Sequence, residues 1–115
     1  MIADAYLALW NEADGAGRRA MLARGWAVDA HYADPLMSGD GREGIAAMIE
    51  GARGQFPGHV FALRGTPDGH GDHVRFSWTL TAPGGAAVAG GTDMVALDGE
   101  GRIARVIGFL DGGVA

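Results

Sequence analysis

The stretch Val74-Arg-Phe-Ser-Trp-Thr-Leu-Thr81 alternates apolar and polar side chains at every position. Because successive side chains of a strand point to opposite faces, this alternation predicts a strand with one buried face. The buried face would carry Val74, Phe76, Trp78 and Leu80. Turn-forming residues precede it at Asp68 to Asp72 and follow it at Pro83-Gly84-Gly85, so the strand belongs to a chain that reverses repeatedly.

Three further strands are expected around this one. They cover Val60 to Gly65, Val88 to Leu97 and Ile103 to Leu110. The last two are joined by Asp98-Gly99-Glu100-Gly101, a strong signal for a hairpin turn. The second half of the chain is therefore predicted to be an antiparallel meander.

The first half has mainly helical spacing. Helices are expected over residues 2–14, 16–25 and 41–56, and the last would open with a capping box formed by Asp40 and Glu43. The inner face of the first helix would carry Ile2, Tyr6, Leu9, Trp10 and Ala13.

Between the second and third helices, residues 27–33 alternate as a half-buried strand, with Val28, Ala30 and Tyr32 on one face. Helices gather early and strands late, which predicts one α+β domain over residues 1–115. Its sheet is mostly antiparallel, with helices packed on one side.

Composition narrows the functional classes. The formal net charge is −5, and the nine basic residues are arginines without a basic run, so neither a nucleic-acid surface nor binding to anionic membranes is expected. The chain has no cysteine, which excludes disulfides and thiolate chemistry. The opening residues lack the positive segment of a signal peptide, and a cytoplasmic location is expected.

Three polar side chains interrupt faces that are otherwise apolar. Asp93 shares a strand face with Val95, Asp34 follows the strand face of Tyr32, and Tyr6 lies on the inner face of the first helix. Two carboxyl groups in different environments can divide the roles of acid and base. The alternative is structural: such a carboxylate binds a helix end or an arginine, for example Arg75 or Arg105.

The chain resembles the NTF2-like superfamily, in particular SnoaL-like proteins and ketosteroid isomerases, over nearly its whole length. The segments that carry the resemblance are Tyr6 to Asn11, Tyr32-Ala-Asp-Pro35, Gly41 to Ile45, Gly91-Thr-Asp93 and the ending from Gly101 to Asp111. The resemblance implies a cone, in which a strongly curved sheet wraps around three N-terminal helices and leaves an apolar cavity. It also implies a homodimer formed through the outer sheet surface.

The resemblance further implies roles for the three polar residues. Asp34 would be the base that moves a proton next to a carbonyl group, and Tyr6 and a protonated Asp93 would stabilise the enolate oxygen. In SnoaL-type cyclases the acid–base catalyst matches Asp93. The candidate substrate-binding residues are Met37, Phe61, Leu63, Phe76, Trp78, Ile107 and Phe109.

The expected function is a cofactor-free acid–base enzyme that isomerises or cyclises an apolar carbonyl compound. The alternative is a non-catalytic module of the same fold that binds a small molecule or dimerises. A dinucleotide site at Gly39 to Gly44 is not expected, because the motif lacks a surrounding βαβ unit. No metal site is expected at His70, Asp72 and His73, which lie in a glycine-rich turn.

Overall fold

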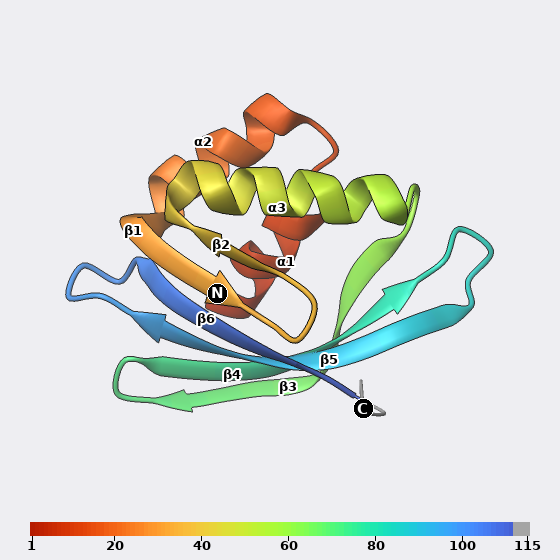
Figure 1. Cartoon of the computed structure of the whole chain (residues 1–115). Coiled ribbons are helices and arrows are strands. Elements are labelled where there is room, and N and C mark those ends of the chain that lie inside the picture. Colours follow the sequence, from red (N-terminus) through yellow and green to blue (C-terminus); the bar gives the residue numbers. More distant parts are fainter. Residues whose placement is uncertain (112–115) are drawn as a thin grey trace.

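Three helices lie on the concave side of one curved sheet in the computed structural model, which describes residues 1–111 (Figure 1). The helices are α1 (Ile2–Asn11), α2 (Gly15–Gly25) and α3 (Gly41–Gln55). The strands are β1 (Trp26–Ala33), β2 (Ser38–Asp40), β3 (Val60–His70), β4 (His73–Thr81), β5 (Ala87–Leu97) and β6 (Ile103–Leu110).

The six strands are ordered β2-β1-β6-β5-β4-β3 across the sheet. Only the β1–β6 pair is parallel among the described strands, and the other neighbours are antiparallel. The sheet curves without closing, and the helices fill its hollow side (Figure 1). The predicted α+β class, with three early helices in a mostly antiparallel curved sheet, is confirmed.

The alternation in the second half of the chain sets the buried face. Phe76 pairs with Asp93 on β5, which in turn pairs with Gly108 on β6, so all three positions face the helices. Val95 and Val106 form the next inward pair and have no exposed surface. These strands pack on apolar helix residues, among them Tyr6, Leu9 and Ile49.

The first strand departs from the predicted register. Val28 was expected to face inward, but it is 68% exposed, whereas Ala27 and Ala30 are buried. The pairing of β1 with β6 shifts between Trp26 and His31, and such an irregularity changes which side chains face the core. The prediction for Val28 is therefore wrong.

Several boundaries also differ. Helix α1 ends at Asn11, so Ala13 is not on its inner face, and β3 continues to His70 through the segment predicted as a turn. The short strand β2 was not predicted, because Ser38-Gly-Asp40 is too short to show alternation. It pairs with β1 and leads directly into α3.

The predicted capping box of α3 is absent. Asp40 occupies the N-cap but its side chain makes no capping hydrogen bond. Its Oδ1 instead lies 2.5 Å from His31 Nδ1, while Glu43 accepts hydrogen bonds from Arg19. Both carboxylates interact with side chains of other elements, so neither caps the N-terminus of α3.

Two side chains form hydrogen bonds at helix ends, and the second also links α1 to the edge of the sheet. Asp14 caps α2 by accepting a hydrogen bond from the Gly17 amide. Asn11, at the end of α1, donates to the Phe61 carbonyl and accepts from the Phe61 amide, both at 2.8 Å. Its side chain thus acts as a strand partner for the start of β3.

Among residues 1–111, no helix has the length and apolar character needed to cross a bilayer.

Replacement of Asn11 with alanine is expected to lower the free energy of unfolding by about 1–3 kcal/mol, because it leaves the amide and carbonyl of Phe61 without partners. Urea titration followed by tryptophan fluorescence measures the change. The control is Ala8→Ser on the exposed side of α1, expected to change stability by less than about 0.5 kcal/mol. Equal urea midpoints for the two variants would contradict the role given to Asn11.

Candidate functional site

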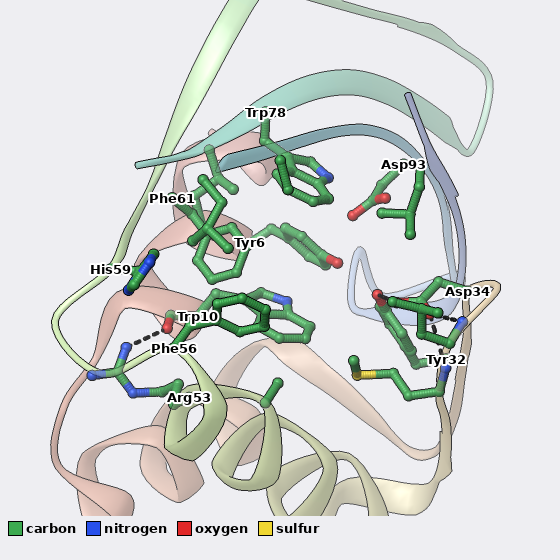
Figure 2. A pocket seen from close by; sticks show the side chains of 17 residues that line it. Tyr6, Trp10, Tyr32, Asp34, Arg53, Phe56, His59, Phe61, Trp78 and Asp93 are labelled. Atoms are coloured by element: carbon green, nitrogen blue, oxygen red, sulfur yellow. Dashed lines mark hydrogen bonds between the residues drawn. The ribbon is translucent and has the colours of Figure 1, made fainter. Parts of the chain in front are cut away.

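A cavity of about 120 Å³ lies between the helices and the concave face of the sheet (Figure 2). Its walls are mainly aromatic and aliphatic, from α1, α3 and the strands. The aromatic side chains that line it are Tyr6, Trp10, Tyr32, Phe56, Phe61 and Trp78. Two carboxyl groups, Asp34 and Asp93, open into the same space.

The three predicted catalytic residues come together in this cavity. Tyr6 comes from the middle of α1, Asp34 follows the end of β1, and Asp93 lies in the middle of β5. Of the predicted substrate-binding residues, Met37, Phe61 and Trp78 also line it. Trp78 therefore forms part of the wall and does not fill the space.

Four predicted binding residues are not among those that line the cavity. Phe76 is buried beneath it, with its ring centroid 5.0 Å from that of Tyr6. Leu63 lies further along the edge strand β3 and is 37% exposed. Ile107 and Phe109 lie on the outer face of the sheet, 42% and 55% exposed.

The misplacement of Ile107 and Phe109 has a structural cause. Ile103 and Val106 of β6 are both buried, so the regular alternation of buried and exposed positions is interrupted between them. This change coincides with a shift in the β5–β6 register next to Leu97. Beyond it, the even-numbered residues face the helices, and the prediction that Ile107 and Phe109 line the cavity is corrected.

Asp93 is the most deeply buried carboxyl group described, with 2% of its surface exposed. Burial, which disfavours the charged form, raises its pKa to about 6, and the charge of Asp34 adds to the increase. Tyr6 and Trp78 lie close enough to oppose part of that increase. No arginine forms an ion pair with Asp93 among the described residues.

Asp34 has a different environment. Its Oδ2 accepts a 2.5 Å hydrogen bond from the Tyr32 hydroxyl, and its Oδ1 accepts from the amides of Leu36 and Met37 at 2.7 and 2.9 Å. The two amide bonds form an Asx-type turn, which Pro35 favours by fixing its own φ. Three donors thus hold both carboxyl oxygens in place at the rim of the cavity.

Two glycines make room for this arrangement. A Cβ atom on Gly108 would lie 2.8 Å from Asp93 Oδ1 and 3.1 Å from Asp34 Cβ. A Cβ atom on Gly91 would lie 2.5 Å from Cζ2 of Trp78. The missing side chains therefore allow the carboxyl groups to approach each other and allow Trp78 to lie against β5.

Tyr6 and Tyr32 both remain protonated donors. Burial raises the pKa of Tyr6 well above its usual value, and the nearby Tyr32 and Asp93 raise it further. Burial also raises the pKa of Tyr32, with its hydrogen bond to Asp34 as the next cause. In Figure 2 the Tyr6 hydroxyl points into the space bounded by Asp93 and Tyr32.

Several lining residues were not predicted. Tyr32 is two positions before Asp34 and Trp10 is four positions after Tyr6, so strand and helix periodicity could have indicated both. Arg53, whose Nη1 donates to the Trp10 carbonyl at 2.8 Å, and His59 lie at another part of the cavity wall. No local pattern places them there.

The described residues contain no group of three or more His, Asp or Glu side chains that could hold a metal ion. The glycines of the segment 39–44 serve close packing: a Cβ on Gly39 would lie 3.0 Å from the Gly44 carbonyl oxygen at the start of α3. The cavity supplies carboxyl, hydroxyl and indole groups in an apolar space, and the guanidinium of Arg53 and the imidazole of His59 at another part of its wall. Such a set can donate hydrogen bonds to an oxygen atom and exchange protons with a bound molecule.

The model of the SnoaL-like domain family matches residues 3–106, and the chain belongs to this family. Solved structures of other SnoaL-like and NTF2-like proteins share the fold described here. A comparison with curated proteins gives no match.

Solved structures include a protein from Agrobacterium tumefaciens described as a proposed isomerase of the SnoaL-like family. It is 59% identical, with a TM-score of 0.95, and the match covers 96% of this chain and 95% of that one. A proposed SnoaL-like polyketide cyclase from Jannaschia is 20% identical, with a TM-score of 0.75 over 95% and 84% of the two chains. A hypothetical protein with a ketosteroid isomerase-like fold from Catenulispora acidiphila, in complex with trimethylamine, is 18% identical, with a TM-score of 0.75 over 93% and 82% of the two chains.

Replacement of Asp93 with asparagine is expected to change how stability depends on pH. The pKa of Asp93 is about 6 in the folded chain and 3.8 ordinarily, so the folded state binds the proton more tightly. The resulting stabilisation is complete below pH about 4 and is lost as pH rises through about 6, a change of about 3 kcal/mol.

Urea unfolding of wild type and Asp93→Asn from pH 4 to pH 8 tests this expectation. The variant should gain stability relative to wild type as the pH rises, and the difference between the two curves isolates Asp93 from other titrating groups. Parallel curves would show that Asp93 keeps its ordinary pKa.

Proposed function

We propose that this chain is an enzyme that moves a proton on a carbon atom next to the carbonyl group of an apolar small molecule. The observation that carries the proposal is the pairing of two carboxyl groups in one apolar cavity. Asp93 is buried with a pKa raised to about 6, whereas Asp34 is held by three hydrogen bonds. Membership of the SnoaL-like family supports this class of reaction.

In the proposed reaction, the Asp34 carboxylate removes a proton from the carbon next to the carbonyl group. The electrons of the broken C–H bond form a C=C bond, and the negative charge moves to the carbonyl oxygen. Tyr6 and protonated Asp93 donate hydrogen bonds to that oxygen. Asp34 then returns the proton to a more distant carbon atom, which completes an isomerisation without any other reactant.

The apolar walls support this division of roles. A developing negative charge is stabilised more by a hydrogen bond in a space without water than by the same bond in water. Tyr6 is 2% exposed and its raised pKa keeps it a donor at neutral pH. The alternative is a module that binds the same molecule without converting it. Both hypotheses require the same cavity, so only a measurement of turnover distinguishes them.

The rate of conversion of a β,γ-unsaturated cyclic ketone to its conjugated isomer tests the proposal by ultraviolet absorbance. Asp34→Asn is expected to lower the rate by about 10²–10⁴, and Asp93→Ala by about 10²–10³. Because Asp93 must donate, kcat/KM should fall as pH rises through about 6.

The matched control is Asp29→Asn. Asp29 is an exposed carboxyl group on β1, the strand that ends just before Asp34, and the variant should keep wild-type activity. Melting temperatures of all variants separate loss of chemistry from loss of fold. Binding of the ketone without any conversion would reject the enzyme and favour the binding module.

We also infer that two copies of the chain pair through the outer face of the sheet. Met94 is paired with Ile107, and Phe109 lies on the same face, giving adjacent apolar side chains that are 42%, 42% and 55% exposed. Polar contacts surround them: Ser77 to Thr92 at 2.7 Å, and Arg75 to Asp68 at 2.7 Å. A patch of this kind matches itself across a two-fold axis.

Sedimentation analysis tests this pairing. Wild type should sediment as a dimer and Phe109→Glu as a monomer, because the new charge would lie in the interface. The control Ala5→Glu adds the same charge on an exposed position of α1, on the opposite side of the sheet, and should remain dimeric. A monomeric wild type at micromolar concentration would reject the inference.

A further inference from the structure

The indole N–H group of Trp10 is buried and has no hydrogen-bond partner among the described residues. Trp10 is 5% exposed, and it also lines the cavity. Buried donors are nearly always paired in folded proteins, so an unpaired one beside a cavity needs an explanation. An acceptor that enters the cavity with a ligand supplies the missing partner.

The surroundings of this N–H group indicate what kind of acceptor fits. Trp10 lies close enough to the Tyr6 hydroxyl to oppose part of the rise in the pKa of Tyr6. Asp93 also lies near that hydroxyl. Figure 2 shows the Trp10 and Tyr6 rings next to each other, with the indole nitrogen on the Tyr6 side. A single oxygen atom placed here would accept hydrogen bonds from both residues.

The size of the cavity limits the rest of the ligand. Its volume is about 120 Å³, whereas an apolar cavity of about 150 Å³ in another protein binds benzene. A molecule of about one ring therefore fits inside the cavity, and a fused four-ring skeleton would have to extend beyond its walls.

The walls leave little room for expansion. The rings of Trp10 and Phe61, and those of Phe61 and Trp78, pack with centroids 5.3 Å apart. Trp78 lies against the backbone at Gly91, where no space for a Cβ atom remains. The aromatic wall is thus supported on both sides and cannot retreat from a larger ligand without moving β5.

We propose that the cavity binds a compact carbonyl compound of about one ring, with its oxygen held by Trp10 and Tyr6. This inference takes the reaction from the proposed function, but it concerns binding and can be tested without turnover. Trp10 becomes a further donor to the carbonyl oxygen, beside Tyr6 and Asp93. The substrate class is then smaller than a steroid or a fused polycyclic ketone.

The test follows the indole N–H signals of the three tryptophans by ¹H–¹⁵N NMR, assigned with tryptophan-to-phenylalanine variants. Cyclohexanone is the probe, methylcyclohexane is a probe of similar size without the oxygen, and a four-ring ketosteroid tests size. Trp26 is 3% exposed and does not line the cavity, so its signal is the internal reference.

Cyclohexanone should move the Trp10 signal in a saturable way and leave that of Trp26 in place. Methylcyclohexane should bind without a comparable shift of Trp10, and the ketosteroid should leave the signal unchanged. Trp10→Phe should weaken cyclohexanone binding by about tenfold and methylcyclohexane binding by less than about twofold, the effect of one lost hydrogen bond.

Two results would overturn the inference: a Trp10 signal that ignores cyclohexanone while other cavity signals respond, or a ketosteroid that binds as tightly as cyclohexanone. The wild-type spectra decide this even where Trp10→Phe folds poorly. Cyclohexanone that shifts Trp10, with no conversion of a β,γ-unsaturated ketone, would reject the proposed reaction and leave the binding inference intact. Conversion of the β,γ-unsaturated ketone without a shift of the Trp10 signal would reject the binding inference and leave the proposed reaction intact.

Discussion

The site depends on the absence of a side chain at position 108. Gly108 is directly opposite Asp93 in the sheet and also lies against Asp34 and the Tyr32 hydroxyl. Any larger residue would occupy the space in which the two carboxyl groups approach each other. Asp34 and Asp93, which lie far apart in the sequence, can therefore share one cavity because the residue between them, Gly108, has no side chain.

That proximity gives the carboxyl groups unequal properties. Asp93 has lost its water and meets mainly apolar neighbours, and desolvation outweighs the hydroxyl and indole groups near it. Asp34 lies at a turn, where two backbone amides and Tyr32 are directed at its oxygens. Burial thus raises the proton affinity of Asp93, whereas hydrogen bonds fix the carboxyl oxygens of Asp34, and two carboxyl groups in such different environments suit separate roles.

Local periodicity was sufficient for every element except the short strand β2, and it singled out the three polar residues that line the cavity. Tyr6 follows from helical spacing, and Asp34 and Asp93 follow from strand alternation, because each rule depends only on neighbours in the chain. The same rules could have identified Tyr32 and Trp10 as residues that line the cavity.

Periodicity failed where the pairing of strands became irregular. Val28 on β1, and Ile107 and Phe109 on β6, were assigned to the wrong face, and both strands contain a shift of register. A bulge depends on the partner strand, so alternation within one strand cannot reveal it. Arg53 and His59 reach the cavity only through the packing of α3 on the sheet, which is likewise a long-range property.

The parallel pairing of β1 with β6 has a consequence for biosynthesis. Tyr6 and Asp34 leave the ribosome before β6, the strand that joins β1 to the rest of the sheet. At about 5–20 residues per second, the helices and β1 wait for seconds with apolar faces uncovered. A nascent chain halted before β6 would have the groups of the site without the wall that buries them. The cavity is therefore completed, and the apolar faces of the helices and β1 are covered, only once β6 has been made.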